Sequence, residues 1–431
     1  MVPSPSAAPP PGGVPAWRRL MAVASQGVAS GTPYMVGTKL LQGWLTASGV
    51  PLGLIGLLAY AELPYTLKMF WAPAMDRWPI RWPDRRRGGL LVLQLVLVAV
   101  IAAVSFLQPG KATAQLTAIG LMALILAVVS ASQDILVDAY RTDLLPENER
   151  GAGAAAANLG YRAAMLAVGA GGFILAGRFG WPLAFLASAV LMVAVLPFTL
   201  TAPAVAPVQH RVASLRQAVA GPAVEFLRRT GGARAVMLLA LVLLYRWPDG
   251  LLNVMAVPFL LQQGFSEAAV GSVLAGWGIA ATIAGTVLGG LLFSRLGMNR
   301  SLWVFAVVGA LGNLSYWALA TFGGGMTGLL AAVGLENLSG GMVGAAFVAL
   351  LMSLCNPRFS ATQYALLSGV YALSRSVLSA QAGFVAEEVG WGSFFLLTVA
   401  SSLPAFVLMA FLTPWNGRGA KGAFDPRRDP T

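Results

Sequence analysis

The amino-acid sequence predicts an all-α membrane protein whose chain crosses the bilayer as twelve transmembrane helices. Of its 431 residues, 57% are hydrophobic and 10% are charged, whereas charged residues make up about a quarter of a typical soluble domain. Apolar segments of about twenty residues, the length that spans a bilayer, recur along the whole chain. Basic residues collect in alternate connections between these segments, which is typical of a protein that crosses the membrane many times.

The predicted spans form two groups of six. The first six lie near residues 20–45, 51–74, 89–107, 114–139, 151–176 and 182–200, and the others near 235–261, 268–293, 302–321, 327–354, 361–385 and 393–412. We therefore expect a disordered leader at 1–16, a six-helix bundle at 17–201, a cytoplasmic linker at 202–232, a second six-helix bundle at 233–415 and a cytoplasmic tail at 416–431. In the linker, residues 212–229 mix apolar and basic side chains and could form a helix that lies on the membrane surface. The 50 glycines suit close packing of helices.

The distribution of Lys and Arg predicts the orientation. With both termini in the cytoplasm, 21 of the 28 basic residues face that side, and only Lys111 and Arg178 face the other. In this orientation the basic residues behind the net charge of +12 face the anionic inner leaflet, so the charge does not require a nucleic-acid partner. One cysteine, Cys355, and one histidine, His210, are too few for an internal disulfide or a metal site, and no cofactor is expected.

The end of the fourth predicted span carries a stripe of charge. Asp134, Asp138 and Arg141 are spaced i, i+4 and i+7, so they share one face of a helix. Charge inside a membrane helix is costly and usually faces a bundle interior or a water-filled cavity, where it marks an ion or substrate pathway. The alternative is that Asp138 and Arg141 only anchor the helix end at the cytoplasmic interface.

Further ionisable residues fall near mid-depth of the predicted spans. Because no histidine lies in a span, we expect carboxylates to be the groups that take up protons. Burial favours their neutral, protonated form. We expect Glu62, Glu336 and Asp134 in this role, and Pro64 can kink the helix beside Glu62. Basic or paired residues at similar depth are Arg162, Arg246, Asp249 and Arg375. The alternative for each is an ion pair that only fixes packing, such as Arg246 with Asp249 or Arg162 with Asp134.

An internal repeat supports the division into halves. Residues 71–77 (WAPAMDR) follow the second span and residues 290–297 (GLLFSRLG) follow the eighth. Two six-helix halves with such loops resemble the major facilitator superfamily, although Ala72 and Ser294 replace a Gly and an Asp of its loop motif. The resemblance implies that Asp76, Arg77 and Arg295, together with Asp138 and Arg141, take part in gating. Plain basic anchors are the alternative.

A sharper resemblance runs through the N-terminal half. The segments are LPYTLKMFWAP at 63–73, ASQDILVDAYRTDLLP at 131–146, ERGAG at 149–153 and LGYR at 159–162. They resemble the AmpG muropeptide permease family, and the stretch from Gln133 to Asp138 is shared with the related acetyl-CoA transporters. Resemblance in the C-terminal half is weaker, and the sequence stops after the twelfth predicted span, without the extra helices of some members.

The resemblance implies a carrier and not an enzyme. The expected activity is proton-driven import of GlcNAc-1,6-anhydro-MurNAc, with or without its peptide, from the periplasm across the bacterial inner membrane for cell-wall recycling, by a monomer in the lipid bilayer. The cargo carries carboxylates, which arginine can hold through two parallel hydrogen bonds. The expected substrate-binding residues are Lys39, Arg162, Arg246, Trp277, Glu336, Asn337 and Arg375, with Trp277 stacking on a sugar.

Three alternatives remain at this point. Another anionic metabolite, such as acetyl-CoA, could be the cargo, because the motif around Asp134 is shared. A membrane-embedded transferase is disfavoured because the outer connections are only a few residues long. A passive channel is disfavoured, because a pore needs neither two mobile halves nor groups that exchange protons.

Overall fold

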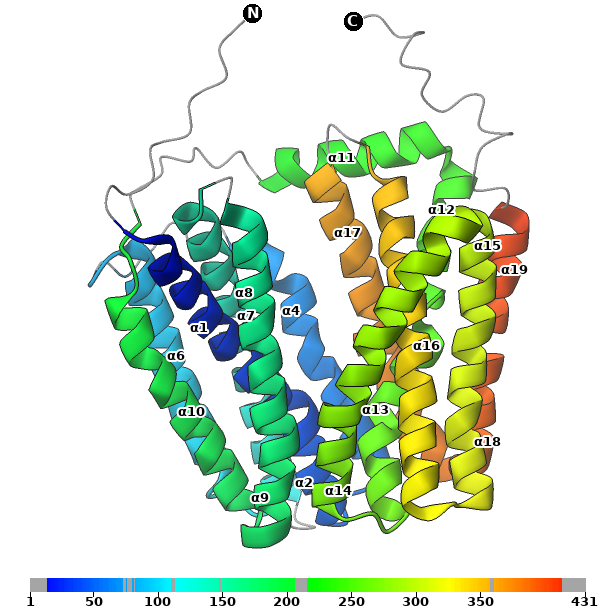
Figure 1. Cartoon of the computed structure of the whole chain (residues 1–431), viewed down its shortest axis with the longest axis horizontal. Coiled ribbons are helices and arrows are strands. Elements are labelled where there is room, and N and C mark those ends of the chain that lie inside the picture. The colour runs from blue at the N-terminus through cyan, green and yellow to red at the C-terminus, as the bar shows by residue number, and fades with distance from the viewer. Residues whose placement is uncertain are drawn as a thin grey trace, which may run out of the picture. The chain divides into compact units, whose positions relative to one another are not determined.

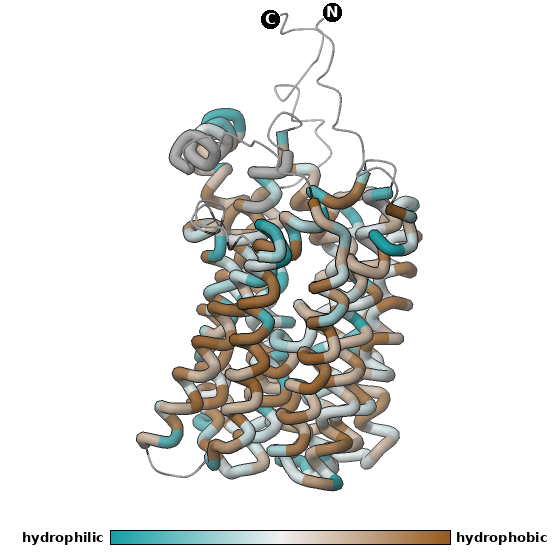
Figure 2. The backbone as a smooth tube through the Cα atoms, turned by 90° about the vertical axis from the view of Figure 1, so that its left-hand side faces the viewer, coloured by the Kyte–Doolittle hydropathy of each residue, from teal (hydrophilic) through white to brown (hydrophobic). Residues whose placement is uncertain are grey.

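Helices make up every regular element in the described part of the chain. The computed structural model describes residues 14–72, 75, 80, 82–109, 113–146, 149–205, 215–356 and 360–412. Within these ranges the all-α prediction is confirmed (Figure 1). Figure 2 shows hydrophobic residues along the length of the helices and hydrophilic ones gathered at their ends, as a bilayer requires. Asp76 and Arg77, most of the leader and the tail at 416–431 lie outside the described residues.

The chain divides into two compact units, which we describe separately. The first consists of Met1–Val50, Leu67–Arg211 and Ser266–Ser272, and the second of Pro51–Thr66, Val212–Phe265 and Val273–Thr431. The helices of the first unit are α1 (Ala16–Met35), η1 (Val36–Leu40), α2 (Leu41–Ala47), η3 (Lys68–Phe70), α6 (Arg85–Val104), α7 (Thr113–Leu144), α8 (Arg150–Ala164), η5 (Met165–Gly171), α9 (Gly172–Phe179), α10 (Trp181–Thr201) and α14 (Glu267–Ser272).

The second unit begins with a broken helical stretch, because Pro64 cannot donate a backbone hydrogen bond. This stretch comprises α3 (Leu52–Gly56), η2 (Leu57–Glu62) and α4 (Leu63–Leu67). The other helices are α11 (Leu215–Thr230), α12 (Gly232–Leu244), α13 (Trp247–Gln262), η6 (Val273–Gly278), α15 (Ile279–Phe322), α16 (Gly325–Leu354), α17 (Ser360–Leu373), η8 (Ser374–Leu378), η9 (Ser379–Gln381), α18 (Ala382–Ala400) and α19 (Leu403–Leu412).

Eight helical stretches among the described residues are long and apolar enough to cross a membrane. Two of them, Glu267–Phe322 with 56 residues and Leu366–Leu412 with 47, exceed the roughly twenty residues of one crossing. Gly297, with φ 72°, and Gly390, with φ 74°, break the helical backbone within these stretches. The chain is therefore a multi-pass membrane protein.

Glycines bring neighbouring helices into backbone contact, as the sequence predicts. A Cβ added to Gly160 of α8 would lie 2.0 Å from the Ala24 carbonyl oxygen of α1. Between α15 and α16, a Cβ on Gly285 would lie 1.9 Å from the Leu338 carbonyl oxygen. No side chain fits at such distances, so these pairs depend on glycine for their close approach.

A buried network of polar side chains ties three helices of the first unit together. Gln26 of α1 donates to the Thr199 hydroxyl of α10 at 2.9 Å, and that hydroxyl donates to Gln94 of α6 at 2.9 Å. Gln94 closes the triangle by donating to Gln26 at 3.0 Å. Each group is satisfied in an apolar surrounding, which fixes the relative register of α1, α6 and α10.

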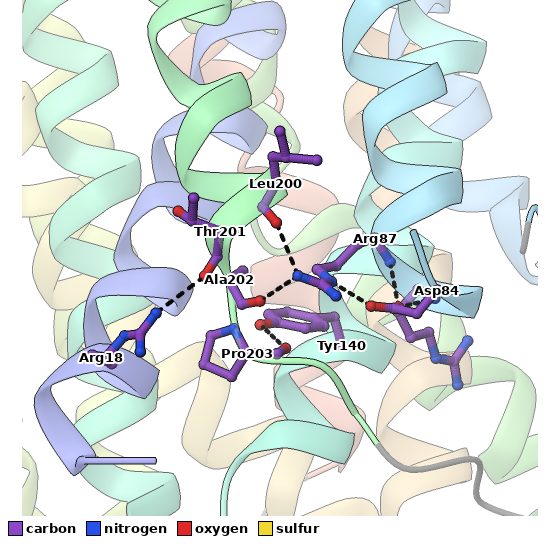
Figure 3. A network of polar contacts seen from close by, with 9 residues as sticks. Arg18, Asp84, Arg87, Tyr140, Leu200, Thr201, Ala202 and Pro203 are labelled. Carbon is purple, nitrogen blue, oxygen red and sulfur yellow. Dashed lines mark hydrogen bonds and ion pairs between the residues drawn. The ribbon is translucent and has the colours of Figure 1, made fainter. Parts of the chain in front are cut away.

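The end of α10 is held by side chains from two other helices of the same unit. Figure 3 shows Arg87 of α6 between the carboxylate of Asp84 and the carbonyl oxygens of Leu200 and Ala202, which accept at 2.9 and 2.7 Å. The Tyr140 hydroxyl of α7 donates to the Pro203 carbonyl at 2.9 Å. These contacts satisfy carbonyl groups that have no partner inside the ending helix.

Candidate functional site

The charged stripe of α7 meets a lysine from a separate segment of the first unit. The ammonium of Lys68, in η3, lies 3.9 Å from Asp134 and 3.7 Å from Asp138. Arg141 donates to the other oxygen of Asp138 at 3.0 Å. Because α7 continues to Leu144, beyond the predicted end at 139, all three stripe residues lie on one helix as predicted. The result is a chain of two acids and two bases without net charge.

Arg162 does not take part in this cluster. It lies half-buried near the end of α8, and no ion pair links it to another described residue. Lys68 therefore occupies the place beside Asp134 that the alternative interpretation gave to Arg162. Lys39 is also half-buried, in the π-helical turn η1, and the neighbouring rings of Tyr34 and Tyr161 have centroids 6.2 Å apart.

Glu62 and Arg375 form an ion pair inside the second unit. The Nε of Arg375 donates to a carboxylate oxygen of Glu62 at 2.6 Å, although the residues lie 313 positions apart. Glu62 ends the 3₁₀-helical turn η2, and Arg375 lies in the π-helical turn η8, which packs against it. A residue predicted to exchange protons and one predicted to hold cargo are thus direct partners.

Arg246 has a different environment. Its Nε donates to Asp249 of α13 at 3.1 Å, three residues along the chain, and its guanidinium lies 5.4 Å from the centroid of the Tyr371 ring. The i, i+3 pair considered from the sequence is therefore present. The aromatic partner is added by the fold, because Tyr371 comes from α17.

Glu336 is buried in α16 and belongs to a short polar chain. Its carboxylate accepts from the Asn337 side-chain Nδ2 at 2.7 Å, and the side-chain Oδ1 of Asn337 accepts from the Thr282 hydroxyl of α15 at 2.9 Å. On α15, the fully buried Tyr316 hydroxyl has no hydrogen-bond partner among the described residues. The carboxyl group predicted near mid-depth of a span is thus buried within α16.

The other predicted residues of the second unit lie at more exposed positions. Trp277 is 49% exposed in the π-helical turn η6, and its indole Nε1 donates to the Leu330 carbonyl at 2.9 Å. Arg295 is exposed on α15, and no ion pair joins it to the described residues. The indole edge of Trp277 is thus fixed while much of its ring surface is open.

Two features of the site were not predicted from the sequence. Lys68 falls within the predicted span at 51–74, but no spacing in the sequence pairs it with Asp134 or Asp138; its position between apolar neighbours is the available signal. The π-helical turns at Lys39, Trp277 and Arg375 carry no recognisable sequence signal. Such turns insert one extra residue into a helix and are frequent at functional sites.

Comparison with known proteins identifies the family to which the chain belongs. The family model of the Major Facilitator Superfamily matches residues 20–379. The fold resembles the nucleoside transporter NupG, with a TM-score of 0.71, 13% identity, and coverage of 92% of this chain and 99% of the other. It also resembles a D-xylose–proton symporter, with a TM-score of 0.67, 15% identity, and coverage of 91% and 96%. Fold and charged spans together define a membrane transporter of this superfamily.

Sequence relatives narrow the assignment. The anhydromuropeptide permease of Escherichia coli (strain K12) is 40% identical over 385 residues, which cover 89% of this chain and 77% of the relative. The putative transporter AmpG 4 of Rickettsia conorii is 30% identical over 405 residues, covering 91% and 96%. The chain belongs to the AmpG family of anhydromuropeptide permeases, so the resemblance seen in its motifs is confirmed.

Proposed function

We propose that this protein imports anhydromuropeptides, GlcNAc-1,6-anhydro-MurNAc with or without its peptide, from the periplasm to the cytoplasm in symport with protons. The observation that carries the proposal is 40% identity with an anhydromuropeptide permease over 89% of the chain. Charged side chains within apolar helices support it, because transporters retain such costly groups on their substrate pathways. The setting is the bacterial inner membrane.

In this proposal the chain forms twelve crossings in two six-helix halves, residues 17–201 and 233–415, and works as a monomer with both termini in the cytoplasm. The two longest apolar stretches, of 56 and 47 residues, each have the length of two crossings. The breaks at Gly297 and Gly390 mark the turns between them. The clustering of basic residues in alternate connections supports the orientation.

Cargo binding is assigned first to two residues of the second unit with accessible surface. Arg375 is 37% exposed, and its guanidinium has the geometry to hold a carboxylate. Trp277 presents its ring to a sugar face. The further members of the set are Lys39, Arg162, Arg246, Glu336 and Asn337.

Gating is assigned to the ion-pair chain at the end of α7. Lys68 lies between Asp134 and Asp138 at distances of 3.9 and 3.7 Å, longer than direct hydrogen bonds. Such long pairs separate at little cost, which suits a contact that opens in each cycle. Arg141 belongs to this chain, and Asp76, Arg77 and Arg295 complete the proposed set of gating residues.

Proton coupling is assigned to the carboxylates Glu62, Asp134 and Glu336. Glu336→Gln keeps an acceptor for the Asn337 amide, which makes it a mild test of one member. We expect proton-driven uptake by this variant to lose its pH dependence, while exchange of cargo at equal pH continues. Unchanged uptake at all pH values would remove Glu336 from the coupling role.

The cargo is tested by uptake into vesicles that contain the full chain. Labelled anhydromuropeptide should accumulate under an inward proton gradient and exchange with unlabelled cargo without chemical change. Acetyl-CoA in the same vesicles is the matched comparison. Preferred uptake of acetyl-CoA would replace the cargo assignment, and a chemically altered product would exclude a carrier.

A further inference from the structure

We propose that a groove between the start of α1 and the end of α10 binds the headgroup of an anionic phospholipid from the cytoplasmic leaflet of the membrane. Arg18 holds the lipid phosphate, and apolar side chains beside it contact the first part of the acyl chains. The choice of leaflet rests on the proposed orientation of the chain. The binding itself depends only on residues of the first unit.

The groove is small and lies at the edge of the helix bundle. Eight residues of α1, α10 and the segment directly after α10 line it, and its volume is about 180 Å³. Sites that enclose a whole drug-sized ligand measure roughly 300–1,000 Å³. The groove therefore suits a headgroup whose acyl chains stay outside, along the apolar surface of the helices.

Contacts that do not involve Arg18 hold the two walls of the groove in place. Gln26 of α1 donates to the Thr199 hydroxyl of α10 at 2.9 Å. On the other side of the end of α10, Arg87 binds the carbonyl oxygens of Leu200 and Ala202 (Figure 3). The walls are thus fixed before a lipid binds, so that little of the protein has to be ordered on binding.

Arg18 is an exposed cation without a carboxylate partner among the described residues. Its Nη2 donates to the Thr201 carbonyl at 3.5 Å, longer than the usual range of about 2.7–3.2 Å (Figure 3). The next residue, Arg19, is instead buried in a pair with Glu149. Three more arginines of the first unit are paired with acids, namely Arg86, Arg87 and Arg141. A phosphate can therefore take the guanidinium of Arg18 without breaking an ion pair.

The charge of the groove favours an anionic headgroup over a zwitterionic one. Arg18 is the only charged residue among the described residues that line it, so no acid is there to receive the ammonium of a zwitterionic lipid. The first turn of α1 has no acidic residue and adds partial positive charge. Arg87 offsets the opposite partial charge at the end of α10. Phosphatidylglycerol, whose only charge is its phosphate, matches this arrangement.

Large apolar side chains border Arg18 within the groove. Met21 lies about one turn farther along α1 and Phe198 about one turn before the end of α10, and they are 50% and 48% exposed. Trp17 is 61% exposed, and tryptophan is enriched where the membrane meets water. This combination fits a molecule that is charged at one end and apolar at the other, whereas a free phosphate ion gains nothing from the apolar side chains.

The test counts the lipids that stay bound to the full chain in native mass spectrometry. Purified protein in a neutral detergent is mixed with phosphatidylglycerol or with phosphatidylcholine of the same acyl chains, and wild type should retain the former preferentially. In Arg18→Gln the half-saturating concentration of the first phosphatidylglycerol should rise about tenfold, as expected for the loss of a hydrogen bond to a charged group. Arg18→Lys retains the charge and should keep most of the binding.

The matched control is Arg178→Gln, which removes the same charge from another exposed residue of the first unit. Arg178 precedes α10, whose 21 residues, about 30 Å in length, separate it from the groove at the other end of that helix. This variant should retain phosphatidylglycerol like wild type. An equal loss in Arg178→Gln and Arg18→Gln would assign the binding to net charge and overturn the inference.

Thermal unfolding of the same proteins separates the lipid from a free anion. Without lipid, Arg18→Gln should melt like wild type, because it gives up only one long contact. Phosphatidylglycerol should raise the melting temperature of wild type at concentrations at which inorganic phosphate and glycerol 3-phosphate do not. Equal stabilisation by either anion would show that the groove binds free anions and not a lipid.

Two further results would overturn the lipid site. One is equal retention of phosphatidylglycerol by Arg18→Gln and wild type, or of the two lipids by wild type. The other is a dimer of the chain that takes the place of the lipid complex and dissociates in Arg18→Gln, which would assign the groove to a second copy. Neither result bears on the uptake of anhydromuropeptide, so the proposed transport function is tested separately.

Discussion

At the residue scale, several ionisable side chains of the spans are held in pairs and short chains. Glu62 pairs with Arg375, and Asp134 and Asp138 share Lys68. The sequence located most of these residues by their cost in a bilayer. It could match neighbours such as Arg246 and Asp249 but not distant partners, because Glu62 and Arg375 lie 313 residues apart and only the fold brings them together.

Replacing Lys68 by Met should weaken both the fold and the transport cycle. Two carboxylates would then face each other without their shared cation. Asp134 and Lys68 are 24% and 29% exposed, so we expect a loss of about 1–3 kcal/mol, below the value for removing one partner of a fully buried pair. Thermal unfolding in detergent measures the loss.

Two companion variants serve as controls for Lys68. Lys68→Arg retains the charge and should remain close to wild type. The double variant Lys68→Met with Asp134→Asn removes one of the two carboxylate charges, so it should recover part of the stability that Lys68→Met loses. A Lys68→Met protein as stable and active as wild type would show that the cluster has no role in either property.

At the element scale, one carboxylate attaches helix α11 to α17 and to Asn356, which follows α16. Figure 1 shows α11 lying across the ends of α17 and α12. Glu225 accepts hydrogen bonds from Asn356 at 2.7 Å and Gln363 at 2.5 Å, and pairs with Arg229 at 3.2 Å. The sequence predicted a helix with mixed apolar and basic residues here; its position on the membrane surface stays a prediction.

The attachment of α11 should weaken in acid. Burial raises the pKa of Glu225, but the hydrogen bonds from Asn356 and Gln363 and the charge of Arg229 outweigh it and lower the pKa overall. The carboxylate therefore adds stability above the unfolded pKa of about 4.3, and this stability is lost as the pH falls through the folded value. Between pH 6 and pH 3.5 the melting temperature should fall less in Glu225→Gln than in wild type. Equal falls would contradict the assignment.

Cys355 is a native reporter of the same attachment. The thiol is half-buried next to Asn356, and burial raises its pKa, so we expect slow reaction with maleimide in the wild type. Glu225→Ala should release α11 and increase the labelling rate at pH 7 severalfold. Arg228→Ala, which changes an exposed residue of the same helix, is the control and should label like wild type. Equal rates in Glu225→Ala and wild type would show that Glu225 does not hold this contact.

At the scale of the whole molecule, the fold combines apolar helices, glycine contacts and a strong asymmetry of charge. The glycines at α1–α8 and α15–α16 set the distances within each unit. The basic residues predict which ends of the helices face the cytoplasm, because positive charge is retained on that side during insertion. Composition therefore indicates membrane residence, and the distribution of basic residues along the chain gives the expected orientation.

The orientation leads to a labelling test on spheroplasts. In a Cys355→Ser background, Gln108→Cys, exposed beyond the end of α6, should react with a membrane-impermeant maleimide from outside. Arg228→Cys, on α11, should react only after permeabilisation. The reverse pattern would show that both termini face the periplasm.

The sequence by itself determined the helical membrane class, the family and most of the charged residues of the candidate site. Hydropathy, charge asymmetry and local motifs are properties of neighbouring residues, and they can be read without a fold. The tertiary structure decided which charges are partners, where helices turn into π-helical segments, and that Lys68 belongs with Asp134 and Asp138. These depend on contacts between distant segments, such as Glu62 with Arg375, whose energies no local pattern contains.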